Sequence, residues 1–265
     1  MQWEQLTAPD FARAVRESGV CVIAMGVIER HSEHLPLGTD YLTCHAIASL
    51  AAEKEPAVVF PPFYFGQIYE ARCFPGTVTI APGLLIELLQ GVFDEIGRNG
   101  FKKIVVYNGH GGNEHLLHFL AQCSLWEEKP YQLYMPMQFL TPEGEKEWEA
   151  LRATSFGGHA CEVETSAVLG TYPDLVKMER VPEQPALPLN RMKDLPPTFT
   201  GIWWYSNYPE HYAGDARAAT EEKGRTLVRL AADSLAQYIT AVKRDEVVPA
   251  LTAEFFQRAR ALSQG

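Results

Sequence analysis

The stretch VCVIAMGVIERHSEHLPLGTD, residues 20–40, joins an apolar run to a cluster of charged groups. The apolar part, residues 20–28, is short, dense and partly β-branched, which is typical of a strand buried on both faces of a parallel sheet. The polar part contains Glu29, His31 and Asp40. A buried strand that ends in charge predicts either a solvated loop or a binding site for a cation.

Apolar runs and amphipathic segments alternate along the rest of the chain. Residues 57–66 are predicted to form a strand and then a loop, and residues 74–80 a turn with a short strand. Two further strands are predicted at residues 101–108 and 131–137. A capping box at Thr7 and Asp10 predicts a first helix, and Asn113 could cap another. Further helices are predicted at residues 41–52 and 82–98, from near Glu164, from Thr220 to about residue 243, and at 250–262, whereas residues 201–220 are expected to form an aromatic loop. Strands that alternate with helices indicate an α/β fold with a mostly parallel sheet covered on both faces. The proline-rich stretch 181–199 is interpreted as a surface excursion, so residues 1–265 are expected to form a single domain.

Composition narrows the class of protein. The 265 residues are 46% hydrophobic and 21% charged, which is enough to bury a sizeable core. The net charge is -10 and there is no block of Lys or Arg, so neither a nucleic acid nor a membrane surface is expected as a partner. The N-terminus lacks the pattern of a signal peptide, and the five cysteines form no CxxC motif. A cytoplasmic location is therefore expected.

Three polar clusters lie where predicted strands end or helices begin. The first is Glu29–Asp40, the second is NGHGGN at residues 108–113, and the third is HACEVE at residues 159–164. Sites in open α/β sheets form beyond the carboxyl ends of the strands. Side chains two residues apart on an extended segment share a face, so Glu29 and His31 are expected to converge.

Mixed carboxylates and imidazoles suit zinc or manganese ions. Two ions that lie close together need a bridging carboxylate and terminal ligands on each side. Glu29, His31, Asp40 and His110, with one later glutamate, would supply such a set. A single ExH pattern is a weak signal, and the GHGGN turn could instead hold a phosphate at a helix N-terminus. The turn lacks the GxGxxG and GxxxxGK[ST] patterns, which disfavours a nucleotide site.

Five motifs in this order resemble those of the creatininase (creatinine amidohydrolase) family. The resemblance covers about residues 20–230, and the motifs are ERHSEHLPLGTD (29–40), FPGT (74–77), NGHGGN (108–113), HACEVETS (159–166) and GDARAATEEKG (214–224). It implies a three-layer α/β/α fold, hydrolysis of a C–N bond and a homo-oligomer, commonly a hexamer. It also implies two divalent ions per chain, which would be zinc, manganese or iron.

The resemblance also implies roles for single residues. Glu29 and His110 would hold one ion, His31 would hold the other, and Asp40 would bridge the two. At the third cluster, the proton-handling groups beside the metal-bound water would be His159 and Glu164.

The chain departs from creatininase proper after His110. Creatininase proper has a tyrosine and a metal-binding glutamate where this chain has Gly111 and Gly112. The NGHGGN form is more similar to the deformylase and peptidase branches of the family. One ion would lose a ligand here unless Glu162 or Glu164 replaces it, and Glu162 is included in the expected metal set.

These observations predict a metal-dependent amidohydrolase that cleaves an amide, lactam or formamide bond in a small molecule. A metallopeptidase for short peptides and a non-catalytic metal-binding protein are the alternatives. The aromatic segment Trp203-Trp204-Tyr205 is expected either to close over a substrate or to pack between subunits. His34 is expected to form hydrogen bonds within its loop, and the helix histidines His115 and His118 to lie on a surface.

Overall fold

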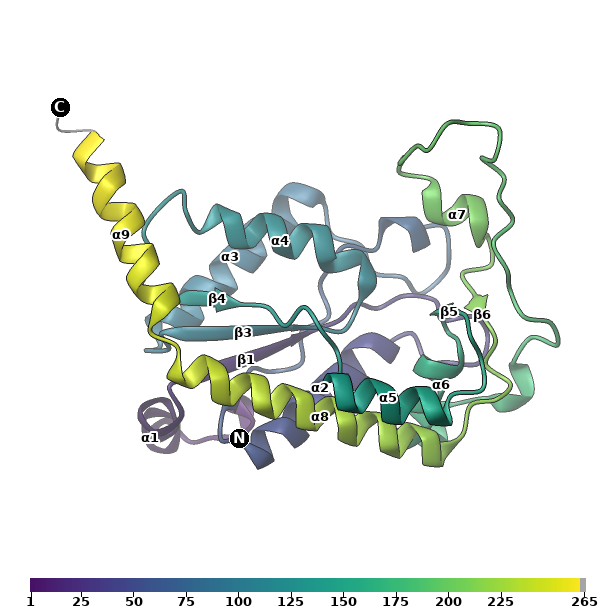
Figure 1. Cartoon of the computed structure of the whole chain (residues 1–265), viewed down its shortest axis with the longest axis horizontal. Helices are drawn as coiled ribbons and strands as arrows, with labels where there is room; N and C mark the ends of the chain where they lie inside the picture. Colours follow the sequence, from purple (N-terminus) through teal and green to yellow (C-terminus); the bar gives the residue numbers. More distant parts are fainter. Residues whose placement is uncertain (263–265) are drawn as a thin grey trace.

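A four-stranded parallel sheet lies at the centre of the computed structural model, which describes residues 1–262 (Figure 1). β1 pairs with β2 on one side and with β3 on the other, so the strand order is β2-β1-β3-β4. The strands span Val58–Val59 (β2), Val20–Met25 (β1), Lys103–Asn108 (β3) and Gln132–Tyr134 (β4). The predicted α/β fold with a parallel central sheet is confirmed.

Helices and a small second sheet surround this centre. The α-helices span Ala8–Ser18 (α1), Thr39–Lys54 (α2), Pro82–Arg98 (α3), Glu114–Cys123 (α4), Pro142–Leu151 (α5), Glu162–Thr171 (α6), Trp203–Asn207 (α7), Glu221–Arg244 (α8) and Val247–Leu262 (α9). The 3-10 helices span Trp3–Gln5 (η1), Tyr69–Ala71 (η2), Gly111–Asn113 (η3), Pro173–Leu175 (η4) and Met178–Arg180 (η5). Two short antiparallel strands span Gly157–His159 (β5) and Ala213–Gly214 (β6).

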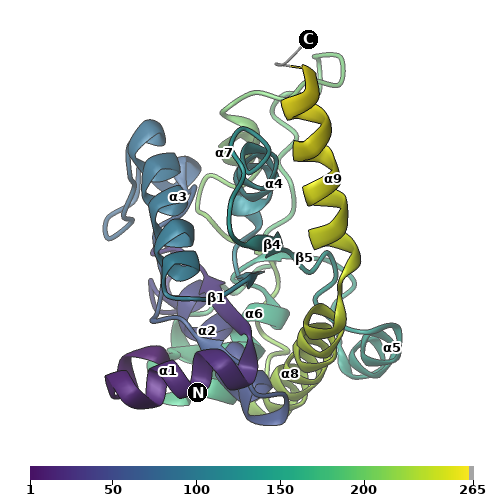
Figure 2. The ribbon, with the colours of Figure 1, turned by 90° about the vertical axis from the view of Figure 1, so that its left-hand side faces the viewer.

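The side chains of β1 divide between two cores, because successive residues of a strand point to opposite faces. Cys21, Ile23 and Met25 pack with α1, α3 and α4 in one core. The residues between them pack with α2, α5 and α8 in the other core. Helices therefore cover both faces of the sheet and give three layers (Figure 2). This burial on both sides explains why the sequence of β1 is apolar throughout.

Helix starts follow the expected capping chemistry. The Thr7 hydroxyl accepts a hydrogen bond from the backbone N–H of Asp10 at the start of α1, and Thr220 does the same for Lys223 at the start of α8. α2 begins at Thr39, two residues before the predicted start. Its first turn therefore contains Asp40, where a carboxylate is favoured by the helix dipole.

Four predicted elements differ from the structure. The strand expected at the start of residues 57–66 spans only Val58–Val59, because the prolines that soon follow lack the N–H that a strand ladder needs. Residues 74–80 form no strand, and Asn113 does not cap α4 with its side chain. Residues 203–207, expected as a loop, form α7. α5, which was not predicted, is capped at its start by Thr141.

The C-terminal helix α9 projects at the end of the molecule opposite α7 (Figure 1). It buries Phe256 and exposes Val247, Leu251 and Leu262. No helix within residues 1–262 combines the length and the apolar character needed to cross a bilayer.

Two glycines let α6 and α8 touch along their backbones. A side-chain carbon built on Gly224 would lie 1.7 Å from the Ser166 carbonyl oxygen, and one on Gly170 would lie 2.4 Å from the backbone of Gly224. This contact holds α6, the helix that carries the third predicted cluster, against the long helix α8.

We expect Gly224→Ala to destabilise the protein by about 1–3 kcal/mol or more, because the added methyl group forces the two backbones apart. Gly91→Ala is the matched control, since Gly91 lies in the helix α3 with no atom within 4 Å of the added carbon. The control should gain about 0.5–1 kcal/mol from the better helix propensity of alanine. Urea unfolding of both variants measures the difference. Equal stabilities would contradict the close packing of α6 against α8.

Candidate active site

The ends of β1 and β3 bring two of the predicted polar segments together. The pairing of these strands continues to Met25 and Asn108, so both end at the same edge of the sheet. The next residues are Gly26 and Gly109, and a side-chain carbon on Gly26 would lie 2.3 Å from a backbone nitrogen of α2. Glycine there lets α2 begin directly at the strand ends, which places its first-turn residue Asp40 at the site.

Four of the predicted metal ligands converge at this point. His31 Nε2 lies 2.9 Å from Asp40 Oδ1. His110 Nδ1 lies 3.0 Å from Glu29 Oε1 and 3.0 Å from Asp40 Oδ2. Glu29, His31 and Asp40 are buried, and the His110 side chain is 9% exposed. Residues from the first and second clusters therefore form one buried group of carboxylates and imidazoles.

The oxygens of this group suit a cation. Glu29 Oε1 and Asp40 Oδ2 are buried and accept no hydrogen bond, although a buried carboxylate oxygen without a partner is costly. Two sets of side chains, Glu29 with Asp40 and His110, and His31 with Asp40 and Glu164, each offer ligand atoms within 4.8 Å of one another. Both sets contain Asp40. A third set in this region replaces Asp40 with a histidine of the third cluster, His159.

The electrostatics of the group favour positive charge between the carboxylates. Burial raises the pKa of Glu29, but the charge of His110 and the hydrogen bond from His211 outweigh it and hold this pKa well below its usual range. Burial lowers the pKa of His31, but the charge of Asp40 and their hydrogen bond reverse the effect and raise it to about 10.

The pKa values of the two predicted proton-handling residues shift in the opposite sense, upward for the carboxyl group and downward for the imidazole. Burial raises the pKa of Glu164 to about 7, although the charge of His31 opposes this rise. Burial, assisted by the charge of His31, lowers the pKa of His159 to about 3. The ring of His159 lies 4.2 Å from that of His31, centroid to centroid, and its Nε2–H donates to the carbonyl of Arg30 at 2.8 Å. His159 is therefore neutral at physiological pH.

The two glutamates of α6 occupy different environments. Glu164 lies 3.9 Å from His31 Nε2 and belongs to one of the ligand sets. Glu162 pairs with Lys223 at 2.5 Å and accepts hydrogen bonds from the backbone of Ala153 and Thr154. The expectation that Glu162 joins the metal set does not match this geometry, because its carboxylate already has three partners elsewhere. Glu164, unlike Glu162, belongs to a candidate ligand set.

Two residues at the site were not among the predicted ones. His211 is buried, and its Nε2 lies 2.6 Å from Glu29 Oε2. The carbonyl of Gln67 accepts a hydrogen bond from His110 Nε2 at 3.0 Å, which leaves Nδ1 facing the carboxylates. The position of His211 just before the GDARAAT motif was the only sequence signal for it, and Gln67 had none.

The remaining histidines serve other purposes. His34 forms a hydrogen bond of 2.9 Å with Thr165 and so ties the first cluster to α6, whereas hydrogen bonds within its own loop were expected. His115 and His118 are exposed on α4, as predicted. His115 also lies at the mouth of the cavity described next.

A cavity of about 500 Å³ opens onto this group. Phe199, Trp203 and Trp204 form an aromatic wall, and Gly111 and Gly112 also line the cavity. Figure 1 shows that α7, which carries the tryptophans, lies beyond the carboxyl ends of the strands. The aromatic segment therefore borders a candidate substrate cavity.

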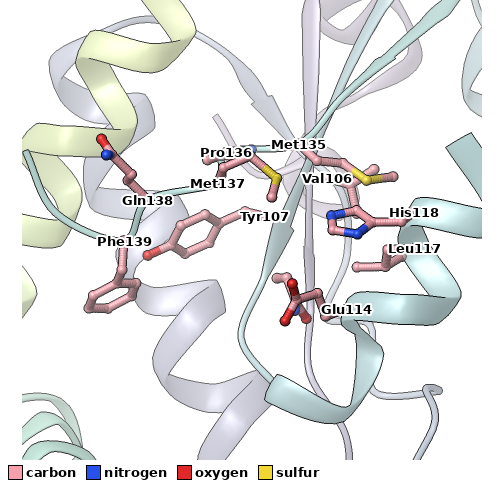
Figure 3. Close-up of a pocket in the computed structure, with 11 residues that line it drawn as sticks. Val106, Tyr107, Glu114, Leu117, His118, Met135, Pro136, Met137, Gln138 and Phe139 are labelled. Atoms are coloured by element: carbon pink, nitrogen blue, oxygen red, sulfur yellow. The ribbon is translucent and has the colours of Figure 1, made fainter.

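A second cavity of about 230 Å³ lies beside β3 and β4 (Figure 3). Glu114 lines both cavities. In the second cavity, His118 and Glu114 are accompanied mainly by apolar and amide side chains, among them Met135, Met137 and Gln138. Among residues 1–262 no candidate metal set includes a residue of this cavity, so the cavity that opens onto the buried carboxylates and imidazoles is the candidate active site.

The chain is similar to known hydrolases of one family. The family model described as creatinine amidohydrolase matches residues 4–239. The creatinine amidohydrolase of Pseudomonas putida is 26% identical over 90% of this chain and 94% of its own length. The 3-dehydro-scyllo-inosose hydrolase of Thermotoga maritima is 26% identical over 92% of this chain and 82% of its own length. The mycofactocin precursor peptide peptidase of Mycolicibacterium smegmatis is 32% identical over 58% of each chain.

The fold is shared with solved structures. A crystal structure of creatinine amidohydrolase (creatininase) superposes with a TM-score of 0.76 over 90% of this chain and 96% of its own, at 24% identity. Solved creatininases include forms described as Zn-Zn type and as Mn. The match of the family model to most of the chain shows that the protein belongs to the creatininase family of metal-dependent hydrolases.

Proposed function

We propose that the protein hydrolyses a C–N bond of a small-molecule amide, lactam or formamide at a centre of two divalent ions. The observation that carries this proposal is the sharing of Asp40 by two sets of candidate ligands. Glu29, Asp40 and His110 would hold one ion. His31, Asp40 and Glu164 would hold the other.

Zinc and manganese suit these nitrogen and oxygen donors, and the descriptions of solved creatininases name both metals. When bound, a pair of such ions supplies a polarised carbonyl and a nucleophile from water at neutral pH. The positive charge of a bound ion would satisfy the oxygens of Glu29 and Asp40 that have no hydrogen-bond partner.

The leaving nitrogen needs a proton, because an amine leaves poorly without one. His159 borders the cavity, and its ring would carry a proton from the attacking water to that nitrogen through Nδ1, because Nε2 donates to the Arg30 carbonyl. The hydrogen bond to the Arg30 carbonyl orients the ring for this role. Glu164 lies near His31 and lines the cavity. Its carboxylate would bind metal and would also stabilise the protonated form of His159.

A small molecule suits the cavity of about 500 Å³ better than a long chain does. A short peptide is the second candidate, because the mycofactocin precursor peptide peptidase is a relative and because the aromatic rim, with Phe199 at 73% exposure, is open. We further propose a single-domain enzyme that acts in the cytoplasm as a homo-oligomer, a hexamer by family resemblance. The exposed apolar residues of α9 and Trp126, which is 93% exposed, support subunit contacts.

The direct test is reconstitution followed by a substrate panel. Protein stripped with a chelator is loaded with zinc or with manganese, and its metal content is measured. Creatinine, a formamidopyrimidine, lactams and short peptides are then assayed. We expect two ions per chain and metal-dependent release of an amine from at least one small amide. Cleavage of the peptides alone would favour the second candidate, and fewer than one ion per chain would contradict the metal centre.

We expect Asp40→Asn to lose both ions, because the amide removes the negative charge that both ligand sets share. Metal content after dialysis measures this loss, and circular dichroism verifies the fold. Glu33→Gln is the matched control, since Glu33 lies in the same segment but is exposed and pairs with Arg30 at 2.5 Å. Two ions retained by Asp40→Asn would show that Asp40 is not the bridge.

Variants of the two glutamates of α6 should separate metal binding from the stability of the fold. We expect Glu164→Gln to lower metal content with little change in the free energy of unfolding. Glu162→Gln should keep its metal but lose about 3 kcal/mol or more of stability, because it breaks a buried ion pair with Lys223. Metal analysis and urea unfolding of both variants give the comparison, and the reverse pattern would assign the ligand role to Glu162.

A further inference from the structure

His211 contacts the proposed metal centre from outside both ligand sets. Its side chain is 3% exposed, and its Nε2 lies 2.6 Å from Glu29 Oε2. The other oxygen of Glu29, Oε1, is the one that faces His110 and has no hydrogen-bond partner. His211 therefore engages one oxygen of this carboxylate and leaves the other free.

The second ring nitrogen of His211 determines its tautomer. Trp204 Nε1 lies 3.1 Å from His211 Nδ1. An indole N–H can only donate, so Nδ1 must accept and carry a lone pair. A neutral imidazole then has its single proton on Nε2. His211 Nε2 is thus a donor to Glu29 and has no lone pair with which to bind a metal ion.

The backbone at His211 is held in an unfavourable conformation. Its φ of 52° lies in the left-handed region, which costs free energy for a residue other than glycine. The His211 carbonyl accepts a hydrogen bond from Ser32 N–H, and the His211 N–H donates to the Tyr208 carbonyl. Ser32 itself has a φ of 55°. Two strained segments are therefore joined at the point where His211 reaches Glu29, and such strain is concentrated at functional sites.

We infer that His211 is a positioning residue for the metal ligand Glu29, and that Trp204 fixes the tautomer in which it acts. The inference rests on the proposed metal centre. Hydrogen bonds to ligating groups orient them and tune their affinity for metal. Trp204 also lines the substrate cavity, so two consecutive hydrogen bonds connect the aromatic wall to the metal centre.

Metal affinity of four variants tests this role. His211→Asn tolerates a left-handed backbone but is too short to reach Glu29. We expect it to weaken zinc and manganese binding by about 10- to 100-fold, measured by competition with a chelator. His211→Gln restores an N–H donor and should recover part of the loss. Trp204→Phe should weaken binding by a smaller factor. Trp203→Phe is its matched control, because Trp203 lines the same cavity without a hydrogen bond to His211, and its metal affinity should not change.

Two further measurements separate positioning from other roles. The double variant Trp204→Phe with His211→Asn should bind no more weakly than His211→Asn alone, because Trp204 acts through His211. Nitrogen-15 chemical shifts of the His211 ring should show a protonated Nε2 and an unprotonated Nδ1 in the metal-free and the zinc-loaded protein. Trp204→Phe retains His211 and the aromatic packing, so it remains informative if His211→Asn does not fold.

The outcomes are distinguishable. Wild-type affinity in His211→Asn overturns the inference while the metal centre stands. A His211 Nε2 that is bound directly to cadmium, shown by coupling to the cadmium nucleus, overturns it in favour of a ligand role. Failure of the wild-type protein to bind any ion overturns both this inference and the proposed function.

Discussion

The parallel pairing of β1 with β3 is the constraint on which the site depends. Its register runs from Val20 opposite Lys103 to Met25 opposite Asn108, so both strands end at one level. A slip of one residue would turn every side chain of β1 to the other face and separate the two polar segments. Because glycine follows each strand, the first turn of α2 can sit directly on both ends. The carboxylate of Asp40 consequently reaches imidazoles from two different loops.

The buried carboxylates of the site cost free energy, which the rest of the fold must offset. Glu29 and Asp40 are buried with imidazoles as their charged neighbours, and each keeps one oxygen without a hydrogen bond. Lys223 of α8, which is partly buried, instead neutralises Glu162. The carboxylate of Glu162 is therefore fully paired, whereas those of Glu29 and Asp40 are not. This arrangement would link stability to metal binding, because an ion that satisfies those oxygens binds the folded chain and not the unfolded one.

Much of this organisation follows from sequence. Dense apolar runs predicted β1 and β3, amphipathic spacing predicted α3 and α8, and motif order predicted the group around Glu29, His31, Asp40 and His110. The strand at 57–66 could not be judged from apolar content alone, because pairing depends on backbone donors that proline lacks. Glu162 and Glu164 are two residues apart in one motif, and only the positions of Lys223 and His31 distinguish them. His211 meets Glu29 across 182 residues of chain, a contact that no local pattern encodes.

Gly112 has a consequence for how this family can change. A side-chain carbon there would lie 2.5 Å from His110 Nε2 and 2.6 Å from the Gln67 side-chain oxygen. Creatininase proper, by the resemblance described above, has a glutamate at the corresponding position. In this chain a glutamate at position 112 would press on the imidazole of His110, a proposed metal ligand, before it added a carboxylate. A design that places a carboxylate at this position must therefore also make room by moving the loop of Gln67, whose carbonyl oxygen lies 2.9 Å from the same side-chain carbon.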